Sequence, residues 1–144
     1  MKLKSSILIL LLWVSASNVV AQTTESENIA TLTYDQLYTK RADYIGKVLR
    51  VKAFHVYGFE WSFLCGTNCT HGEDRVWVDF VDEDDLCKGS RRKLKVGSQK
   101  YFDNRAEVIY VGKLSSGQFG HFGVYPYQLT VSCVEKFKRM PPLN

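Results

Sequence analysis

The chain has 144 residues, 45% of them hydrophobic, which suits one domain with a single core and is too short for two ordinary domains. Its 19 Lys and Arg residues against 15 Asp and Glu residues give a net charge of +4, a small excess for a nucleic-acid-binding protein. The one basic cluster, Arg91 to Lys95, follows an acidic cluster, Asp82 to Asp85, and we expect the two to attract each other weakly in solvent. Charge and composition therefore disfavour nucleic acid as a partner.

The first 21 residues have the layout of an export signal. Lys2 and Lys4 precede an apolar run from Ile7 to Val14, and Val19 and Ala21 are placed as in A-x-A-like cleavage sites. The alternative is an uncleaved membrane anchor, but the apolar run is about half of the roughly 20 residues that a membrane-spanning helix needs. We therefore expect cleavage after Ala21, with no membrane span in the mature chain.

The predicted cleavage site and the pattern of apolar residues divide the chain into four expected segments. Residues 1–21 are the signal peptide, 22–31 a flexible leader, 32–138 the folded domain and 139–144 a tail. The leader is polar and has no apolar periodicity, which is typical of a flexible segment. Loss of Lys2 and Lys4 with the signal lowers the net charge from +4 to +2. The mature protein is expected to be secreted or periplasmic, in an oxidising compartment.

All four cysteines follow the predicted cleavage site: Cys65, Cys69, Cys87 and Cys133. An even number of cysteines in an exported chain favours disulfides, and three pairings are possible. The sequence does not distinguish these pairings, and we expect one bridge rather than two.

A helix is predicted from Tyr34 to about Asp43. Thr33 can cap its N-terminus, and Gln36 can reach back to complete a capping box. Lys40 and Arg41 would then lie near the C-terminus of the helix, where positive charge is favourable.

Beyond Gly46 the hydrophobic period changes to two, which predicts strands. In the first strand the apolar parity shifts near Ala53, which indicates a bulge. Four further strands are predicted, at Trp61–Cys65, Arg75–Val81, Ala106–Leu114 and Tyr127–Phe137. In the last strand Cys133 has the parity of the apolar residues before it, so it is predicted to point into the core.

Two connections are long. The stretch from Asp82 to Asn104 exceeds most loops and should contain a short helical turn. The stretch from Ser115 to Pro126 is rich in glycine and aromatic residues, and is predicted to be a loop that can bring backbone and rings close to a ligand.

Three short sequence motifs resemble those of a known group of proteins. They are Tyr44–Val51 (YIGKVLRV), Val76–Asp79 (VWVD) and Phe119–Tyr125 (FGHFGVY). They resemble phrases of small exported bacterial proteins of unassigned function that look OB-like, and the resemblance covers most of residues 44 to 134. It implies an all-β fold: a five-stranded OB-like Greek-key barrel, here preceded by one short α-helix. It brings no catalytic residue with it.

The resemblance also implies a binding face. OB barrels bind ligands on the face of strands two and three, framed by the loops between strands one and two and between four and five. Mapped onto this chain, the face would present Trp61, Phe63 and Trp77, with Phe119, His121, Phe122 and Tyr125 at its rim. Such rings can stack on sugars or bases, although a domain of this size also needs many rings for its core.

The competing hypothesis is a small metal-binding or redox protein. Cys65, Cys69, His71 and Cys87 provide three thiols and an imidazole, which is the ligand set of a Cys₃His zinc site. Against zinc, the first pair has C-x3-C spacing, the second half lacks a paired C-x-x-C, and export favours oxidation of the thiols.

No nucleophile, metal-hydrolase or phosphate-loop motif is present, so the sequence does not predict an enzyme. We interpret the chain as an exported, non-catalytic binding or accessory module for an unknown ligand or an envelope protein. It is expected to be monomeric or weakly associated and to need no cofactor. Asn68 begins an N-x-[ST] glycosylation pattern, which chance explains equally well.

Overall fold

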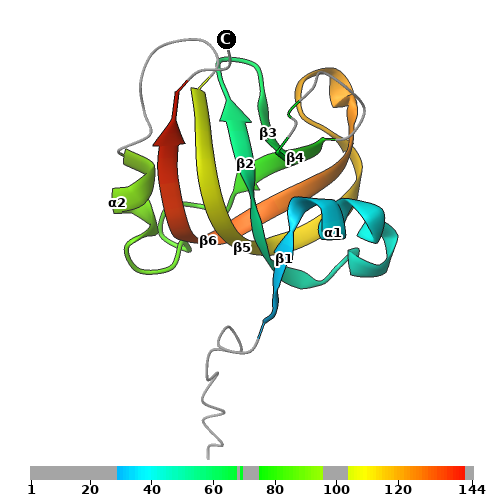
Figure 1. Ribbon diagram of the computed structural model, residues 1–144, viewed down its shortest axis with the longest axis horizontal. Helices are drawn as coiled ribbons and strands as arrows, with labels where there is room; N and C mark the ends of the chain where they lie inside the picture. The colour runs from blue at the N-terminus through cyan, green and yellow to red at the C-terminus, as the bar shows by residue number, and fades with distance from the viewer. Residues whose placement is uncertain (1–28, 68, 70–74, 96–103, 142–144) are drawn as a thin grey trace, which may run out of the picture.

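The computed structural model describes residues 29–67, 69, 75–95 and 104–141 (Figure 1). The predicted signal peptide, most of the predicted leader and the sequon residue Asn68 lie outside these residues. Along the chain the elements are β1 (Thr31–Thr33), α1 (Tyr34–Thr39), η2 (Arg41–Tyr44), β2 (Val48–Tyr57), β3 (Ser62–Cys65), β4 (Val76–Phe80), α2 (Ser90–Lys95), β5 (Asn104–Phe119), η3 (His121–Gly123) and β6 (Tyr125–Met140). Within the described part of the chain, no helix is long and apolar enough to cross a membrane.

The strands form one mixed, six-stranded sheet in the order β1-β2-β3-β4-β6-β5. An additional pairing between β2 and β5 closes all strands except β1 into a ring. Within the ring β4 and β6 run parallel and the other neighbours are antiparallel. The prediction of a mostly β fold is confirmed. The structure adds β1, which pairs in parallel with β2.

Helix α1 begins with the predicted capping box. The backbone N–H of Thr33 donates to the Gln36 side chain at 2.9 Å, and the Gln36 N–H donates to the Thr33 hydroxyl at 3.3 Å. The helix ends earlier than predicted, at Thr39, and η2 follows it. Arg41 donates to the carbonyl of Tyr38 at 2.7 Å, so this cation satisfies an acceptor at the helix end, as its position predicts.

The predicted bulge near Ala53 is wrong. β2 pairs with β5 in continuous register from Val48 to Tyr57. The shift in apolar parity has another cause: in the second half of β2, apolar side chains are packed on both faces of the strand. Phe54 and Val56 belong to a hydrophobic cluster on the outer face of the ring, while Ala53 lies in the inner core. A strand buried on both faces loses the alternation from which register is read.

The glycine-rich stretch predicted as a loop is mostly strand. β5 runs to Phe119 and β6 begins at Tyr125, so only a short turn containing η3 remains between them. These two strands are longer than predicted and make the most extensive pairing in the sheet. At Gly112 the strands come so close that a Cβ would lie 2.5 Å from the carbonyl oxygen of Thr130, so this position needs glycine.

Cys133 does not point into the core as predicted. Register shifts in the pairing of β5 and β6 change the parity of β6 between Val131 and Val134. Val134 is fully buried in the core, opposite Tyr110, whereas Cys133 is only partly buried and is bonded to Cys87. The prediction assumed strict alternation of side chains along the strand, and such a pattern does not reveal a bulge. This explains why the predicted orientation of Cys133 is wrong.

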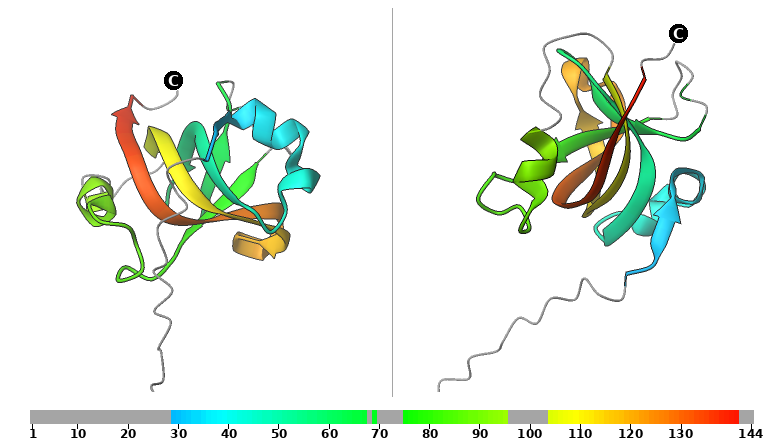
Figure 2. Two further views of the ribbon diagram at one scale, coloured as in Figure 1. Left: turned by 90° about the horizontal axis from the view of Figure 1, so that it is seen from below. Right: turned by 60° about the vertical axis from the view of Figure 1, so that its left-hand side comes forward.

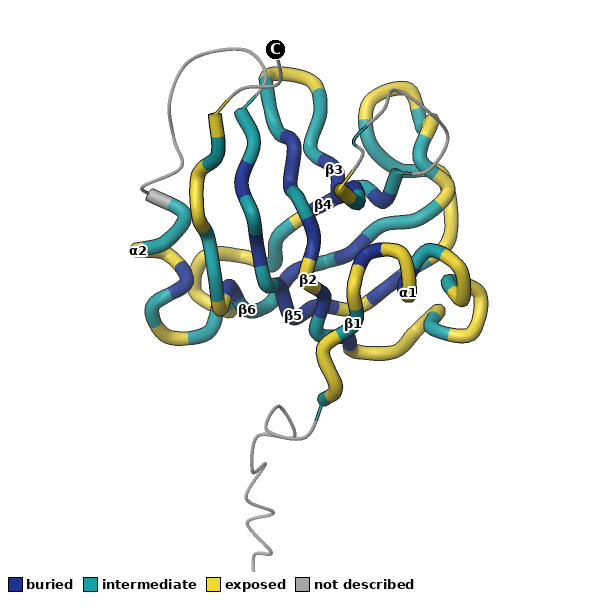
Figure 3. Tube along the Cα trace, in the orientation of Figure 1, coloured by how far each residue is buried: buried dark blue, intermediate teal, exposed yellow. Residues whose placement is uncertain are grey.

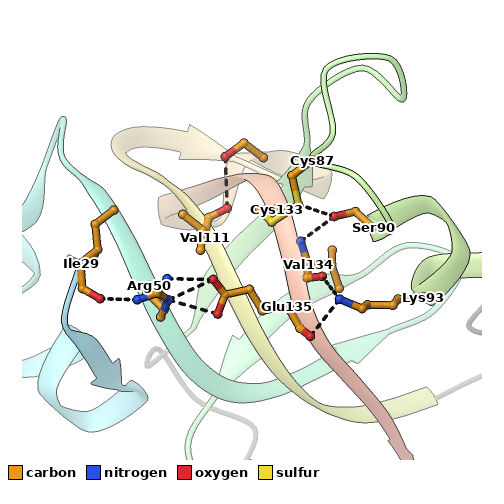
Figure 4. Close-up of polar contacts among 10 residues, drawn as sticks. Ile29, Arg50, Cys87, Ser90, Lys93, Val111, Cys133, Val134 and Glu135 are labelled. Carbon is orange, nitrogen blue, oxygen red and sulfur yellow. Dashed lines mark hydrogen bonds and ion pairs between the residues drawn. A yellow bond between two sulfur atoms is a disulfide. The ribbon is translucent and has the colours of Figure 1, made fainter. Parts of the chain in front are cut away.

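The long connection after β4 contains α2, which confirms the predicted helical turn. Figure 4 shows how this segment is attached to β6: Cys87 is bonded to Cys133, and the buried Ser90 hydroxyl accepts a hydrogen bond from the Val134 N–H at 2.8 Å. The Lys93 ammonium donates to the carbonyl of Val134 at 2.8 Å. A covalent bond and backbone hydrogen bonds thus hold a helix that is too short to be stable alone.

The structure has two disulfides rather than the one expected, Cys65–Cys69 and Cys87–Cys133. The views in Figures 1 and 2 place α1 and α2 on opposite sides of the ring. The inner core lies inside the ring and includes residues from every strand from β2 to β6, and buried segments follow the middle of the strands in Figure 3. The second, smaller cluster lies on the outer face around Cys65.

Candidate functional site

Four of the predicted site residues come together on the outer face of the ring: Trp61, Phe63, Trp77 and Tyr125. Val56 of β2, Phe63 of β3 and Trp77 of β4 are neighbours in register, so their side chains share one face. Tyr125, at the start of β6, adds its ring to this row. Its centroid lies 5.0 Å from that of Trp77 and 6.2 Å from that of Phe63. Together with Trp61, which packs against the same cluster, these rings form what we call the aromatic face: Trp61, Phe63, Trp77 and Tyr125.

Part of the aromatic face is packing rather than open surface. Phe63 is buried, because Tyr125 stacks on it and the Arg75 guanidinium lies 4.1 Å from its ring centroid. Arg105 covers Phe54 in the same way, at 4.0 Å. Neither arginine is among the predicted site residues, although Arg75 begins one predicted strand and Arg105 immediately precedes another, where a long side chain can fold back over a ring.

Trp61 lies between the packed cluster and solvent. It is partly exposed, and it packs against the outer cluster formed by Val56, Phe63 and Cys65. Its indole Nε1 is buried and has no hydrogen-bond partner among the described residues. A buried N–H without an acceptor costs free energy, so Trp61 holds a donor that a ligand or a small rearrangement would satisfy.

The predicted rim residues lie in the β5–β6 hairpin. Phe119 pairs with Tyr125 across the hairpin, and His121 and Phe122 form the exposed turn between them. The turn rests on the aromatic face at Gly120, which has φ +70° and leaves only 2.5 Å between a would-be Cβ and the ring of Trp77. Glycine is needed there for both conformation and space. It positions the segment His121–Val124, which we call the hairpin tip.

The hairpin tip presents apolar surface to solvent. Phe122 is 88% exposed and makes an edge-to-face contact with His121, with ring centroids 4.0 Å apart. It is also the one non-glycine residue with positive φ, +60°, among the described residues. A bulky residue in the left-handed region is a strained choice, and such strain is commonly found at functional sites.

The residues of the metal hypothesis are not assembled as a thiolate site. Cys65 is bonded to Cys69, and Cys87 is bonded to Cys133 on the other side of the domain. Zinc needs deprotonated thiols, which these sulfur atoms do not provide while they are bonded in pairs. His71 lies outside the described residues, and the described part of the chain contains no group of His, Cys, Asp or Glu side chains placed to hold a metal ion.

His55 is the third histidine, and it lies inside the ring in a hydrogen-bonded network. Its Nδ1 lies 2.8 Å from the hydroxyl of Tyr110, and its Nε2 lies 3.1 Å from the hydroxyl of Ser62. Because Ser62 donates its own proton to the carbonyl of Val78 at 2.9 Å, it accepts from Nε2–H, and Nδ1 accepts from Tyr110. The network links β2, β3, β4 and β5, so His55 has a structural role.

This network makes stability depend on pH. Burial lowers the pKa of His55 to about 3, from 6.5 in an unfolded chain. Below pH 6.5 the unfolded chain binds a proton at His55 that the folded protein does not bind, so the free energy of unfolding falls as the pH falls toward 3. At pH 4.5 the expected loss is about 2 to 3 kcal/mol, at 1.36 kcal/mol per pH unit.

Denaturant unfolding of the wild type and of His55→Gln between pH 7 and pH 4.5 measures this effect. Gln can still accept from Tyr110 and donate to Ser62, but it does not titrate. The carboxylates contribute to both proteins, so the difference in slope isolates His55. Parallel stability curves for the two proteins would contradict the assignment of a buried, neutral imidazole.

Comparison of the chain with protein-family models, with curated proteins and with solved structures gives no match. The case for a function therefore depends on the geometry of the aromatic face and the hairpin tip.

Proposed function

We propose that this chain is an exported, non-catalytic binding or accessory module, and that its ring of strands is an OB-like Greek-key barrel. In an OB barrel the first strand pairs with the second and the fourth, and the third runs parallel to the fifth. Counted from β2, the ring has the same pairings: β2 with β3 and with β5, and β4 parallel to β6. Two disulfides suit the oxidising compartment that the signal peptide predicts.

The observation that carries the proposal is the position of Tyr125. Its ring joins the hairpin to Trp77 on the outer face of β3 and β4, and this is the face on which OB barrels bind ligands. Trp61, Trp77 and Tyr125 are each partly exposed, and His121 and Phe122 of the hairpin tip directly follow Gly120, which lies against Trp77 and Tyr125. A ligand would stack on the exposed ring edges and contact the tip, while Phe63 supports the rings from below.

Tryptophan fluorescence can test this directly. Beyond the predicted signal peptide the chain has two tryptophans, Trp61 and Trp77, and both lie in the aromatic face. Fluorescence of the mature protein therefore reports on this face alone. Titration with neutral glycans, peptides and oligonucleotides is expected to change the emission for one of these classes, with matching NMR shifts at the hairpin tip.

Two exposed variants and one matched control refine the test. His121→Ala and Phe122→Ala should leave the fold intact and weaken that binding about tenfold, as truncation of a contact residue does. Ile45→Ala is the control, because Ile45 is also an exposed apolar residue, at 43%, but lies between η2 and β2, outside the two loops that frame the aromatic face. Emission and chemical shifts that stay unchanged across the whole panel would refute the small-ligand form of the proposal.

A further inference from the structure

The β5–β6 hairpin has an unusual composition for this chain. From Leu114 to Val134 there is no Lys, Arg, Asp or Glu, although charged residues make up 24% of the sequence. Depletion of charge together with enrichment in Tyr and Phe is the compositional mark of the centre of a protein–protein interface.

The tip of this hairpin exposes apolar side chains at a conformational cost. Phe122 is 88% exposed and Val124 is 67% exposed. Phe122 adopts φ +60°, which Gly or Asn would adopt more cheaply. An exposed ring contributes little to the free energy of folding. Within the described fold, therefore, no contact of Phe122 compensates for its backbone strain. A contact outside the chain would explain it.

The same hairpin has a free strand edge. β2 pairs with β5 as far as Lys113, and Lys47 extends the contact to Leu114. From Ser115 to Phe119, β5 pairs with β6 alone among the described residues. Proteins usually protect such an edge with lysine or proline, and this edge has neither.

We propose that two copies of this chain associate through these hairpins about a two-fold axis, with Phe122 and Val124 at the centre of the contact. A two-fold interface brings each patch against itself, so any net charge on the patch would repel its copy. The uncharged segment from Leu114 to Val134 avoids that repulsion, and its apolar tip and free edge provide the attraction. The other candidate, a lipid surface, is disfavoured because the segment from Leu114 to Val134 has no Lys or Arg to attract anionic headgroups.

The proposal uses the hairpin tip of the proposed ligand site, but it does not depend on ligand binding. Its experiment is carried out without any ligand, so failure of one proposal is distinguishable from failure of the other.

Sedimentation velocity of the disulfide-bonded mature protein, from micromolar to millimolar concentration, is the first measurement. The wild type is expected to change from monomer to dimer over this range. Phe122→Asn should weaken the association at least tenfold and keep the fold, since Asn tolerates positive φ. Phe59→Asn, at an equally exposed phenylalanine in another turn, should associate like the wild type.

Opposite charges at Val124 test the symmetry. Val124→Lys and Val124→Glu should each stay monomeric, because each places two like charges near the axis, and an equal mixture of the two should dimerise. A monomeric wild type at all concentrations, or a mixture no more associated than its components, would overturn the proposal. Phe122-dependent binding of the monomer to phosphatidylcholine or phosphatidylserine vesicles would assign the tip to lipid instead.

Discussion

Val78→Asp is expected to lower the free energy of unfolding by about 3 to 5 kcal/mol. Val78 is 2% exposed and lies in the inner core, where an aspartate would be desolvated. Its carbonyl also accepts the hydrogen bond of Ser62, which ends the network that begins at Tyr110. The substitution also places a carboxylate in β4, next to its short pairing with β3.

Val48→Asp is the matched control, because it introduces the same group into a strand at a position that is 51% exposed. Its expected cost is about 1 kcal/mol or less, within the range of strand propensities. Urea unfolding followed by circular dichroism measures both variants. Equal losses would contradict the assignment of Val78 to the interior of the ring.

Replacing both cysteines of the Cys87–Cys133 bridge by serine is expected to cost about 4 kcal/mol. The bridge joins residues separated by 46 positions, so breaking it releases a long loop in the unfolded chain. It also frees α2, which is held to β6 by the hydrogen bonds of Ser90 and Lys93. The loss of stability should therefore be accompanied by faster amide exchange in residues 87–95.

The second disulfide is the internal control. Cys65 and Cys69 are separated by 4 positions, and the same loop-entropy relation gives about 2 kcal/mol for their replacement by serine. Thermal and denaturant unfolding of the two double variants under non-reducing conditions gives the comparison. A larger loss for Cys65 and Cys69 than for Cys87 and Cys133 would show that packing of the outer cluster, rather than loop closure, dominates.

Local features were predictable because their cause lies within a few residues. Thr33 and Gln36 form the capping box that their spacing predicts, since both partners of each hydrogen bond lie in one helical turn. The strands were recognisable where one face meets the core and the other meets solvent. Val76 and Val78 alternate with Trp77 in this way, and both valines are buried.

The candidate site was partly predictable in the same sense. An order of strands implied by resemblance placed Phe63, Trp77 and Tyr125 together, and these rings are in contact. That Phe63 is buried beneath Arg75 and Tyr125 could not be predicted, because the covering groups come from other strands. Nor could the strain at Phe122, which depends on how the turn closes β5 onto β6.

The sequence alone determined where β2 to β6 lie, though not the full length of β5 and β6 or the presence of β1. It also determined where α1 begins and that the cysteines suit disulfides. These properties follow from short-range periodicity, local hydrogen bonds and composition. Only the tertiary structure decided the disulfide pairing, the outward position of Cys133 and the two-sided burial of β2. These depend on register shifts and on contacts between residues far apart in the chain, so no window of neighbouring residues contains them.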